Sequence, residues 1–312
     1  MGRRRRETGP VIDGVLVIDK PAGPTSHDVV ARVRRALGQK RVGHTGTLDP
    51  AATGVLVVCL GRATKLVRFL QAGRKTYAAT MLLGVETDSQ DADGSIVAET
   101  DASAVDERSL CEALTGFQGE ITQLPPMVSA VKVGGERLHA KARRGEVVDR
   151  EPRAVTVHEL VLDAFEPGER ATASFLVTCS AGTYVRTLAH DVGRHLGVGG
   201  SLTALRRVAN GPFTTDDAIT LEELDGLAAS GELAAHVLDP GAALARLLPS
   251  FELDDPAVLA KLVQGQPLPD PPELELFAVT AGATLVGVYA GGQDGAPARP
   301  ELVWTRPEEL PS

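Results

Sequence analysis

The chain of 312 residues has little cysteine, few aromatic residues and no long hydrophobic run. Its three cysteines, Cys59, Cys111 and Cys179, are far apart and odd in number, which disfavours a disulfide framework or a zinc site and indicates a reducing cytoplasm. No apolar run reaches the ~18 residues of a membrane span, and we expect no signal peptide at the basic start. A hydrophobic fraction of 43% still allows a sizeable globular core.

Several motifs of familiar chemistry are also missing. The sequence contains no GxxxxGK[ST], no CxxC and no GxSxG, and His190 and His195 are five residues apart, the wrong spacing for an HExxH zinc pair. The stretch DADG at 91–94 resembles a calcium loop, but its positions 1 and 12 would be Ser89 and Thr100. We interpret it as an acidic surface turn.

Charge is distributed unevenly along the chain. The net charge is −9, but residues 215–312 hold 17 acidic against 4 basic residues, a net of −13, which leaves +4 for residues 1–214. Residues 31–75 carry ten Lys or Arg and one acid, Asp49. Such a local excess can steer a phosphate backbone, although a solvated basic helix face would have the same composition.

Apolar patterns predict strands and helices without a regular βαβ rhythm, which favours an α+β fold over a doubly wound sheet. On the strand at 75–84, Tyr77, Ala79, Met81 and Leu83 share one face because side chains alternate along a strand. Ser26 is expected to cap the first helix. The other expected strands are 14–19, 55–60 and 171–180, and the expected helices are 27–37, 63–73 and 182–197.

The sequence predicts three parts of different composition. Residues 1–10 form a basic flexible tail, residues 11–246 form the main domain, and residues 247–312 form a small, acidic, β-rich domain. Within the main domain, residues 124–153 are polar and rich in Lys and Arg, as expected of an insertion that touches a partner.

The stretch RVGHTGTLDPAATGVL, residues 41–56, places Asp49 among small and aliphatic residues. An Asp-Pro turn would explain it without any chemistry. A carboxylate kept ionised in a cleft could instead act as a nucleophile or base, and Arg186 is the best candidate for the cation that lowers its pKa. An aspartyl phosphatase is a further possibility, but it would need magnesium and a second carboxylate, and this stretch offers neither.

Five motifs resemble those of the bacterial tRNA pseudouridine synthase B family in order and spacing. They are VIDKPAGPTSHDVV, RVGHTGTLDPAATGVL, KTYAATMLLGVETDSQDADG, CSAGTYVRTLAHDVG and LTALRR. The resemblance is strong over about residues 11–215. It implies isomerisation of uridine 55 in the T-loop of tRNA, without cofactor or metal. It also implies a pseudouridine synthase fold, with a central, mainly antiparallel mixed sheet flanked by helices and a small PUA-like C-terminal domain.

The resemblance also assigns roles to individual residues. Asp49 matches the catalytic aspartate, Tyr77 the tyrosine that stacks on the flipped base, and Arg186 the arginine paired with the aspartate. Tyr184 matches a tyrosine that contacts the substrate, and Leu205 an apolar residue against the base. The physical logic agrees, because a stacked base must be flipped out before an enzyme can act on it.

Further residues match substrate-binding positions of the family. His44 matches the histidine that fills the stack left by the flipped nucleotide, and Lys20 belongs to the motif that braces the active-site loop. Arg143 and Arg144 lie in the insertion that would hold RNA phosphates. Val128 and His139 stand where the family often has tyrosine, which puts the detailed contacts of the insertion in doubt.

Two other functions compete with this interpretation. A non-catalytic RNA-binding or RNA-folding module could use the same scaffold, but binding alone does not require a buried acid facing RNA. A metal-dependent aspartyl hydrolase is the second competitor, and activity that survives EDTA would remove it. We expect a cytoplasmic monomer whose partner is the tRNA T-arm, with no membrane and no metal.

Overall fold

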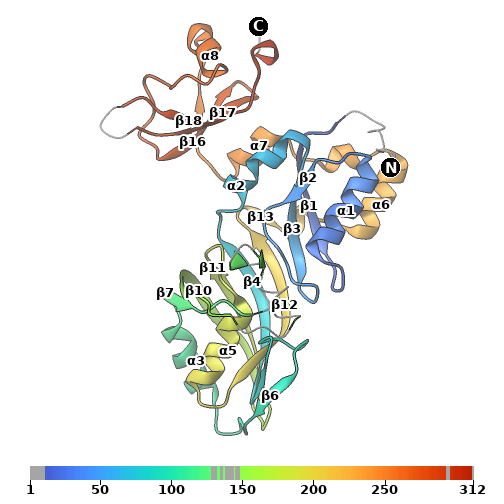
Figure 1. The fold of residues 1–312 in the computed structure, drawn as a ribbon, viewed down its shortest axis with the longest axis vertical. Coiled ribbons are helices and arrows are strands. Elements are labelled where there is room, and N and C mark those ends of the chain that lie inside the picture. Colours follow the sequence, from blue (N-terminus) through green and yellow to red (C-terminus); the bar gives the residue numbers. More distant parts are fainter. Residues whose placement is uncertain are drawn as a thin grey trace.

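The structure, a computed structural model, describes residues 11–127, 132–133, 136–137, 144, 148–292 and 296–310. Its fold is mixed α+β, as predicted, and a long sheet runs through most of the molecule (Figure 1). The strands are β1 (Gly14–Lys20), β2 (Val42–His44), β3 (Thr53–Leu60), β4 (Lys75–Leu83), β5 (Val85–Thr87), β6 (Ile96–Glu99), β7 (Gly119–Gln123), β8 (Lys132–Val133), β9 (Glu136–Arg137), β10 (Arg153–Glu166), β11 (Thr172–Cys179), β12 (Gly200–Asn210), β13 (Phe213–Thr214), β14 (Ile219–Thr220), β15 (Ser250–Glu252), β16 (Leu276–Ala281), β17 (Thr284–Ala290) and β18 (Arg299–Val303). The helices are α1 (Ser26–Leu37), α2 (Val67–Leu70), α3 (Glu107–Gly116), α5 (Val185–His195), α6 (Leu221–Ser230), α7 (Pro240–Ala245) and α8 (Pro256–Leu262), with 3₁₀ turns η1 (Gly61–Leu66), η2 (Thr215–Asp217), η3 (Leu233–His236) and η4 (Pro307–Glu309).

The main sheet has two halves that meet at β3 and β12. Its strand order is β14-β1-β3-β12-β4-β11-β10-β7, and all pairs along this path are antiparallel except β1 with β14 and β3 with β12. The prediction of a mainly antiparallel mixed sheet is confirmed. The parallel contact between β3 and β12 is short, because only Arg206 and Arg207 pair with Thr53 and Gly54.

Each half of the sheet has its own helices. Helices α1 and α6 pack on β1 and β3, where Val29, Val30 and Val33 of α1 are buried. Helices α3 and α5 cover the other half, against the face that Tyr77, Ala79, Met81 and Leu83 share (Figure 1). The alternation predicted for β4 is therefore confirmed, and it places Tyr77 on the face where α5 begins.

The N-cap of the first helix lies one residue earlier than predicted. Thr25 is the N-cap: its hydroxyl accepts a hydrogen bond from the Asp28 amide at 3.1 Å, and the Asp28 carboxylate accepts one from the Thr25 amide at 2.9 Å. The prediction that Ser26 caps this helix is wrong. Ser26 is 1% exposed, and its hydroxyl bonds instead to the backbone of Leu48, next to Asp49.

The helix predicted at 63–73 is a 3₁₀ turn, η1, followed by the single α-helical turn α2. The Thr64 hydroxyl donates to the Gly61 carbonyl at 2.8 Å, and such local bonds compete with the α-helical ladder. After α2, the Lys75 ammonium binds the carbonyls of Gln71 and Gly73 at 2.8 and 2.7 Å. These contacts end the helix and fix the start of β4.

The C-terminal segment forms a small four-stranded sheet, β15-β16-β17-β18, with α8 beside it (Figure 1). It has a core of its own, yet Ala278, Leu285 and Val288 are buried in one cluster with Val15 and Val57 of the main sheet. This segment therefore shares part of its core with the larger domain.

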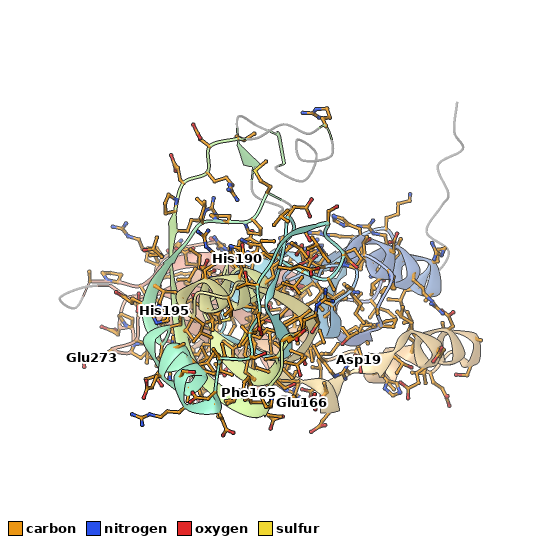
Figure 2. The ribbon with its side chains drawn as sticks, turned by 90° about the horizontal axis from the view of Figure 1, so that it is seen from below. Asp19, Phe165, Glu166, His190, His195 and Glu273 are labelled. Carbon is orange, nitrogen blue, oxygen red and sulfur yellow. The ribbon has the colours of Figure 1, made fainter. Side chains whose placement is uncertain are left out.

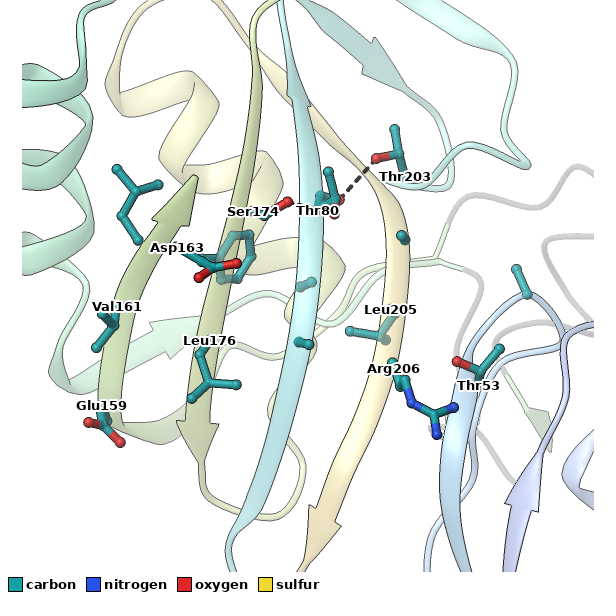
Figure 3. A pocket seen from close by; sticks show the side chains of 16 residues that line it. Thr53, Thr80, Glu159, Val161, Asp163, Ser174, Leu176, Thr203, Leu205 and Arg206 are labelled. Carbon is teal, nitrogen blue, oxygen red and sulfur yellow. Dashed lines mark hydrogen bonds between the residues drawn. The ribbon is translucent and has the colours of Figure 1, made fainter. Parts of the chain in front are cut away.

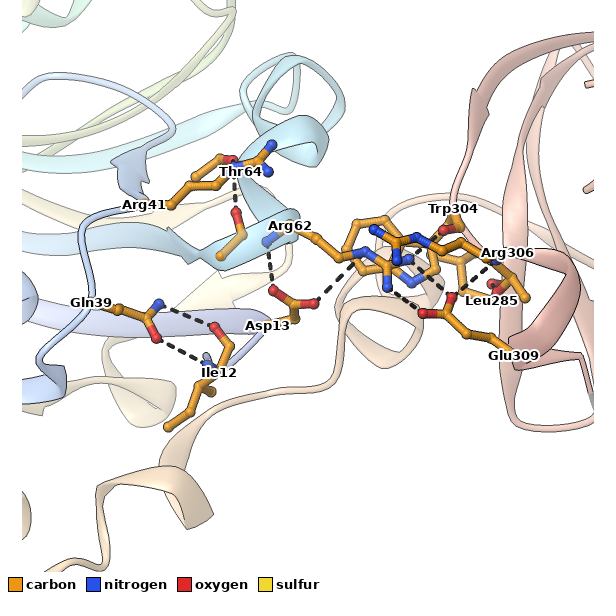
Figure 4. Close-up of polar contacts among 12 residues, drawn as sticks. Ile12, Asp13, Gln39, Arg41, Arg62, Thr64, Leu285, Trp304, Arg306 and Glu309 are labelled. Atoms are coloured by element: carbon orange, nitrogen blue, oxygen red, sulfur yellow. Dashed lines mark hydrogen bonds and ion pairs between the residues drawn. The ribbon is translucent and has the colours of Figure 1, made fainter. Parts of the chain in front are cut away.

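Polar contacts join the same two parts (Figure 4). The Arg62 guanidinium donates to the Glu309 carboxylate at 2.8 Å and to the Trp304 carbonyl, and it lies over the Trp304 ring, 4.9 Å from the centroid. The Arg62 amide donates to the Asp13 carboxylate at 2.6 Å. One arginine at the end of β3 thus connects the first strand to the end of the chain.

Candidate active site

A cavity of about 330 Å³ lies where the two halves of the sheet meet. It is lined by the loop before β3, the first residues of β4, the turn into α5 and one side of β12. Five residues singled out from the sequence line it: Asp49, Tyr77, Tyr184, Leu205 and Arg186. The fold therefore brings together groups that are up to 156 positions apart in the sequence.

A larger cavity of about 730 Å³ lies over the middle strands of the sheet (Figure 3). Its lining includes Ala78 and Thr80, which alternate with Tyr77 along β4 and so point to the opposite face. The catalytic candidates Asp49, Tyr77 and Arg186 are absent from its lining. The candidate active site is therefore the smaller cavity, because the catalytic candidates line it and not the larger one.

The Asp49 loop is held by contacts from the first strand and helix. The Lys20 side chain is fully buried, and its ammonium donates to the carbonyls of Pro21 and Pro50 at 2.9 and 3.0 Å. The Pro50 carbonyl also accepts from the Gly23 amide at 2.9 Å, and Ser26 holds Leu48. Burial lowers the pKa of Lys20 to about 8, while the nearby Asp49 charge acts in the other direction.

Arg186 lies between two carboxylates. Its guanidinium is 3.0 Å from the Asp49 carboxylate through Nη2 and 3.0 Å from the Asp91 carboxylate through Nη1. The Arg186 side chain is 6% exposed, whereas the Asp49 side chain is 47% exposed and faces the cavity. The pairing of Asp49 with Arg186, expected from the sequence, is present in the structure.

The pKa of the Asp49 carboxyl reflects opposing influences. Burial, the largest of them, raises this pKa above its ordinary value. The Arg186 charge lowers it, as expected from the sequence, but the negative charge of Asp91 adds to the rise. The net shift is upward because burial and the second acid together outweigh the arginine.

Asp91 is a functional candidate that the sequence analysis missed. The Asp91 side chain is 22% exposed, and its carboxylate accepts from the Ser89 hydroxyl at 2.5 Å and the Arg186 guanidinium at 3.0 Å. The turn is docked on β12, since the Ala92 amide donates to the Leu202 carbonyl at 2.9 Å. The stretch DADG is an exposed acidic turn, as interpreted from the sequence, but it points one of its two acids inward to Arg186.

The docked turn also contains a strained residue. Gln90 has a φ of 66°, the left-handed region that favours glycine, and its side-chain oxygen accepts from the Thr187 hydroxyl at 2.7 Å. Its carbonyl accepts from the Leu202 amide at 3.0 Å. These contacts on both sides hold the turn that carries Asp91 against α5 and β12.

Tyr77 lies across the cavity on β4. It is 7% exposed, and burial raises the pKa of its phenol, while Arg207 acts in the opposite direction through its charge and a side-chain hydrogen bond. Tyr184 is the N-cap residue of α5, and the Gln123 side chain binds its amide at 2.9 Å and its carbonyl at 3.2 Å. The start of the helix that carries Arg186 is thereby fixed.

His44 ends β2 and directly precedes Thr45, the first residue of the loop that lines the cavity. Its Nδ1 accepts from the Gly46 amide at 3.2 Å, and its ring meets His27 edge-on at a centroid distance of 5.5 Å. Burial, followed by the charges of His27 and Arg207, lowers the pKa of His44 to about 4. The imidazole is therefore neutral at physiological pH.

Two further buried cations line the cavity, and the sequence analysis did not single them out. Lys75 is 6% exposed and Arg207 is 1% exposed, and no carboxylate in the described part of the chain pairs with either. Burial lowers the pKa of Lys75 to about 8. A signal was present for Arg207, which ends the quoted motif LTALRR, but a basic residue at a strand position is commonly exposed.

Other expectations fall partly or wholly outside the described residues. Arg143, Val128 and His139 lie outside them, as do residues 1–10, and Arg144 is exposed. His190 and His195 lie on α5 (Figure 2), and His190 is 3.9 Å from Glu86. In the parts that the structure describes, no group of three or more His, Cys, Asp or Glu could hold a metal ion, and no helix is long and apolar enough to cross a membrane.

Comparison with known proteins gives one family over most of the chain. Residues 34–185 match the TruB family pseudouridylate synthase N-terminal domain, and residues 186–250 match the tRNA pseudouridylate synthase B C-terminal domain. The chain is 54% identical over 244 residues to tRNA pseudouridine synthase B of Symbiobacterium thermophilum, covering 78% of this chain and 80% of that protein. It is 49% identical over 236 residues to the same enzyme of Geobacter sulfurreducens, covering 76% and 77%.

Solved structures agree in fold. A chain from an H/ACA RNP bound to a substrate RNA containing 2′-deoxyuridine is 27% identical, has a TM-score of 0.73, and is matched over 96% of this chain and 87% of its own length. A chain from a Cbf5-Nop10-Gar1 complex is 28% identical with a TM-score of 0.74, covering 96% and 87%. Both alignments extend through the small C-terminal sheet as well as the main sheet, since they leave only 4% of this chain unmatched.

Proposed function

This chain belongs to the TruB family of pseudouridylate synthases, and from that premise we propose that it converts a uridine of tRNA into pseudouridine. The specific target that we propose is uridine 55 in the T-loop, flipped out of its stack into the 330 Å³ cavity. The observation that supports this most directly is the Asp49 carboxylate, half exposed towards the cavity and held at 3.0 Å by a buried arginine.

The reaction needs no second substrate, because it rearranges one nucleotide. The bond between N1 of uracil and C1′ of the ribose breaks, and a bond between C5 and C1′ forms. C5 then loses its proton and N1 gains one. Asp49 is the proposed nucleophile or base, and Tyr77 is positioned to stack on the base and accept the C5 proton.

The remaining candidates position these groups. Leu205 and Tyr184 line the cavity and would contact the base and its ribose, and Lys20 braces the loop from below. Stacking of the flipped base on Tyr77 would recover about 1–3 kcal/mol of the cost of extruding it. Asp91 has the role of holding Arg186 in place for Asp49.

A non-catalytic RNA-binding module on the same scaffold is the competing hypothesis. Such a module would gain nothing from burying Arg186 between two carboxylates, because each buried ion must be desolvated at a cost of several kcal/mol. A catalytic carboxylate, in contrast, requires a fixed cation that keeps Asp49 oriented and ionised. The enzyme is therefore the better supported of the two.

One assay tests the proposed function directly. A T-loop stem-loop RNA labelled with tritium at C5 of uridine should release tritium to water in step with pseudouridine formation, and the release should persist in EDTA. A matched RNA with cytidine at position 55 is the control. Binding of the uridine RNA without any tritium release would favour the non-catalytic module.

The acid limb of the pH–rate profile is expected to lie above the ordinary pKa of an aspartate, which is about 3.9. Asp49 must be ionised to react, and its pKa is raised by burial and by Asp91, so the rate should fall as pH drops through this raised value. The Asp91→Asn variant lacks one of the charges that raise the Asp49 pKa, so the acid limb of its pH–rate profile should move to lower pH. Because this variant also loses the charged contact with Arg186, its maximal rate should be lower. Single-turnover rates across pH would measure both, with the exposed Asp101→Asn as the control. A limb unchanged in Asp91→Asn would contradict the assignment.

Salt should weaken RNA binding steeply if residues 31–75 and the 124–153 insertion hold phosphates. The logarithm of affinity is expected to fall by roughly 0.7–0.9 per phosphate contact for each tenfold rise in salt. Replacing Arg143 and Arg144 by Ala should flatten that slope without changing the rate at saturating RNA. An unchanged slope, measured by titration at several salt concentrations, would place the RNA path elsewhere.

Three finer points complete the proposal. We propose that the enzyme acts as a monomer, that it contacts the T-arm of tRNA, and that it works in the cytoplasm. Residues 11–246 would form the catalytic domain and residues 247–312 the PUA-like domain. Residues 247–312 hold 10 acidic against 3 basic residues, so the small domain should not bind phosphates strongly.

A further inference from the structure

Arg207 occupies the point where the two halves of the main sheet join. On β12 it pairs with Tyr77 of β4 on one side and with Gly54 of β3 on the other. Gly54 has a φ of 100°, and a Cβ atom there would lie 2.2 Å from the Arg207 carbonyl oxygen. The close approach of the two halves therefore requires glycine at position 54, and it places the Arg207 side chain beside the cavity.

The Arg207 guanidinium contacts both ends of the loop that carries Asp49. Its Nε donates to the Val55 carbonyl at 2.7 Å, and its Nη2 donates to the Gly46 carbonyl at 3.2 Å. Gly46 is three residues before Asp49 and Val55 is six residues after it. The rigid, planar guanidinium can make both contacts at once, whereas the single ammonium of lysine cannot reproduce this geometry.

The same guanidinium acts on Tyr77. The two side chains stand on neighbouring strands in direct register and line the same cavity, and the Arg207 charge acts to lower the pKa of the Tyr77 phenol. A buried arginine usually has a carboxylate partner, but none of the described acids pairs with Arg207. Among the described residues, its hydrogen-bond partners are the carbonyls of Val55 and Gly46, so its positive charge remains beside Tyr77 at the cavity.

We propose that Arg207 is a positioning residue that holds the Tyr77 hydroxyl and the Asp49 loop in register across the cavity. The proposal rests on the proposed function, since it gives Tyr77 and Asp49 a substrate on which to act. It assigns to Arg207 a task distinct from that of Arg186, which contacts the Asp49 carboxylate itself but lies on α5 and not at the seam between β3 and β12.

The chemistry explains why a cation is useful at this position. Breaking the bond between N1 and C1′ leaves negative charge on the uracil, and the C5 proton must later move to a basic oxygen. A cation fixed beside the phenol stabilises the charge on the uracil, and it also stabilises the phenolate form of Tyr77 that can accept the C5 proton, because it needs no reorganisation during the reaction. A displacement of about 1 Å at such a site can reduce a rate by about 10²-fold.

The contact with Tyr77 can be tested without any activity measurement. The chain has only three tyrosines, Tyr77, Tyr184 and Tyr289, so protein labelled with ¹³C at tyrosine Cζ should give three resolved signals. Loss of one signal in Tyr77→Phe assigns it. In Arg207→Met, we expect the Tyr77 signal to move while the Tyr289 signal stays in place. If Arg207→Met does not fold, Arg207→Lys serves for the same measurement.

Arg206 supplies the matched control. It precedes Arg207 on β12 but lines the larger cavity over the opposite face (Figure 3). Its guanidinium binds the Asp19 carboxylate at 3.0 and 2.7 Å. Arg206→Met should leave the Tyr77 signal and the single-turnover rate unchanged. Arg207→Lys should lower that rate by about 10²-fold at saturating RNA, with little change in RNA affinity.

The tyrosine spectrum and the rate measurement distinguish a failure of the Arg207 proposal from a failure of the proposed function. A wild-type protein that forms no pseudouridine would overturn the proposed function, whatever the tyrosine spectrum shows. An unmoved Tyr77 signal in both Arg207 variants would overturn the positioning role even if the enzyme is active. A rate in Arg207→Lys within threefold of wild type, or an equal loss in Arg206→Met, would also overturn it.

Discussion

Replacing Asp49 by Asn is expected to abolish pseudouridine formation while the protein stays folded and still binds tRNA. The amide keeps the shape of the side chain and the turn, but it removes the charge and the nucleophile. Phosphate contacts and base stacking are made by other residues, so affinity should persist. Tritium release, RNA affinity and melting temperature, measured on one preparation, separate chemistry from folding.

The cost in stability of Asp49→Asn should be small. The Asp49 side chain is 47% exposed, and Arg186 keeps its 3.0 Å contact with Asp91, so the guanidinium is not left without a carboxylate. A loss of about 0.5–1.5 kcal/mol, the net worth of one hydrogen bond, is the expected scale. The exposed Asp163→Asn, on the opposite face, is the control. Residual turnover of Asp49→Asn within tenfold of wild type would exclude the assignment of Asp49 as nucleophile.

Deleting residues 247–312 is expected to destabilise the whole protein. The acidic composition of the segment, taken alone, predicts only a modest, uniform loss of tRNA affinity on deletion. The structure changes that expectation, because Leu285 and Val288 are buried in one cluster with Val57 of the main sheet, and Arg62 binds Glu309. Each large side chain lost from a core costs roughly 2–5 kcal/mol, so the deletion approaches the stability of a typical domain.

Thermal melting measures this effect. A loss of ~5 kcal/mol corresponds to a fall of roughly 10–20 °C in Tm for a domain of this size. Leu285→Ala in the full-length chain keeps all acidic residues but removes one shared side chain, so it should lower Tm without changing the salt dependence of RNA binding. A truncated protein with wild-type Tm and turnover would show that the shared core contributes little.

The alternation of apolar residues identified the main elements of the fold from sequence. Together with continuous apolar runs, it located β1, β3, β4, β11 and α5 to within a few residues, because β4, β11 and α5 each bury one face and β1 and β3 are buried at nearly every position. It failed for the helix at 63–73, where Thr64 bonds back to Gly61 and tightens the chain into a 3₁₀ turn. Such side-chain bonds to the backbone act over single turns and leave no periodic signal.

The site was only partly predictable for a similar reason. Asp49, Tyr77 and Arg186 stand in motifs that can be recognised one at a time. Asp91 and Arg207 acquire a role only through contacts with distant segments, Arg186 on α5 and Gly46 in the Asp49 loop. A single sequence shows that a turn is acidic, but only the fold shows towards which cation it points.

The position of β12 in the sheet has a consequence for synthesis on the ribosome. This strand, Gly200–Asn210, lies between β3 and β4, which are complete by residue 83. More than a hundred residues must therefore emerge before β12 can pair with β4 and join it to β3, and until then the edge of β4 on that side is unpaired. Unpaired strand edges and late long-range pairing promote aggregation of nascent chains. We therefore expect newly made protein to depend on chaperones until residue 210 has left the exit tunnel.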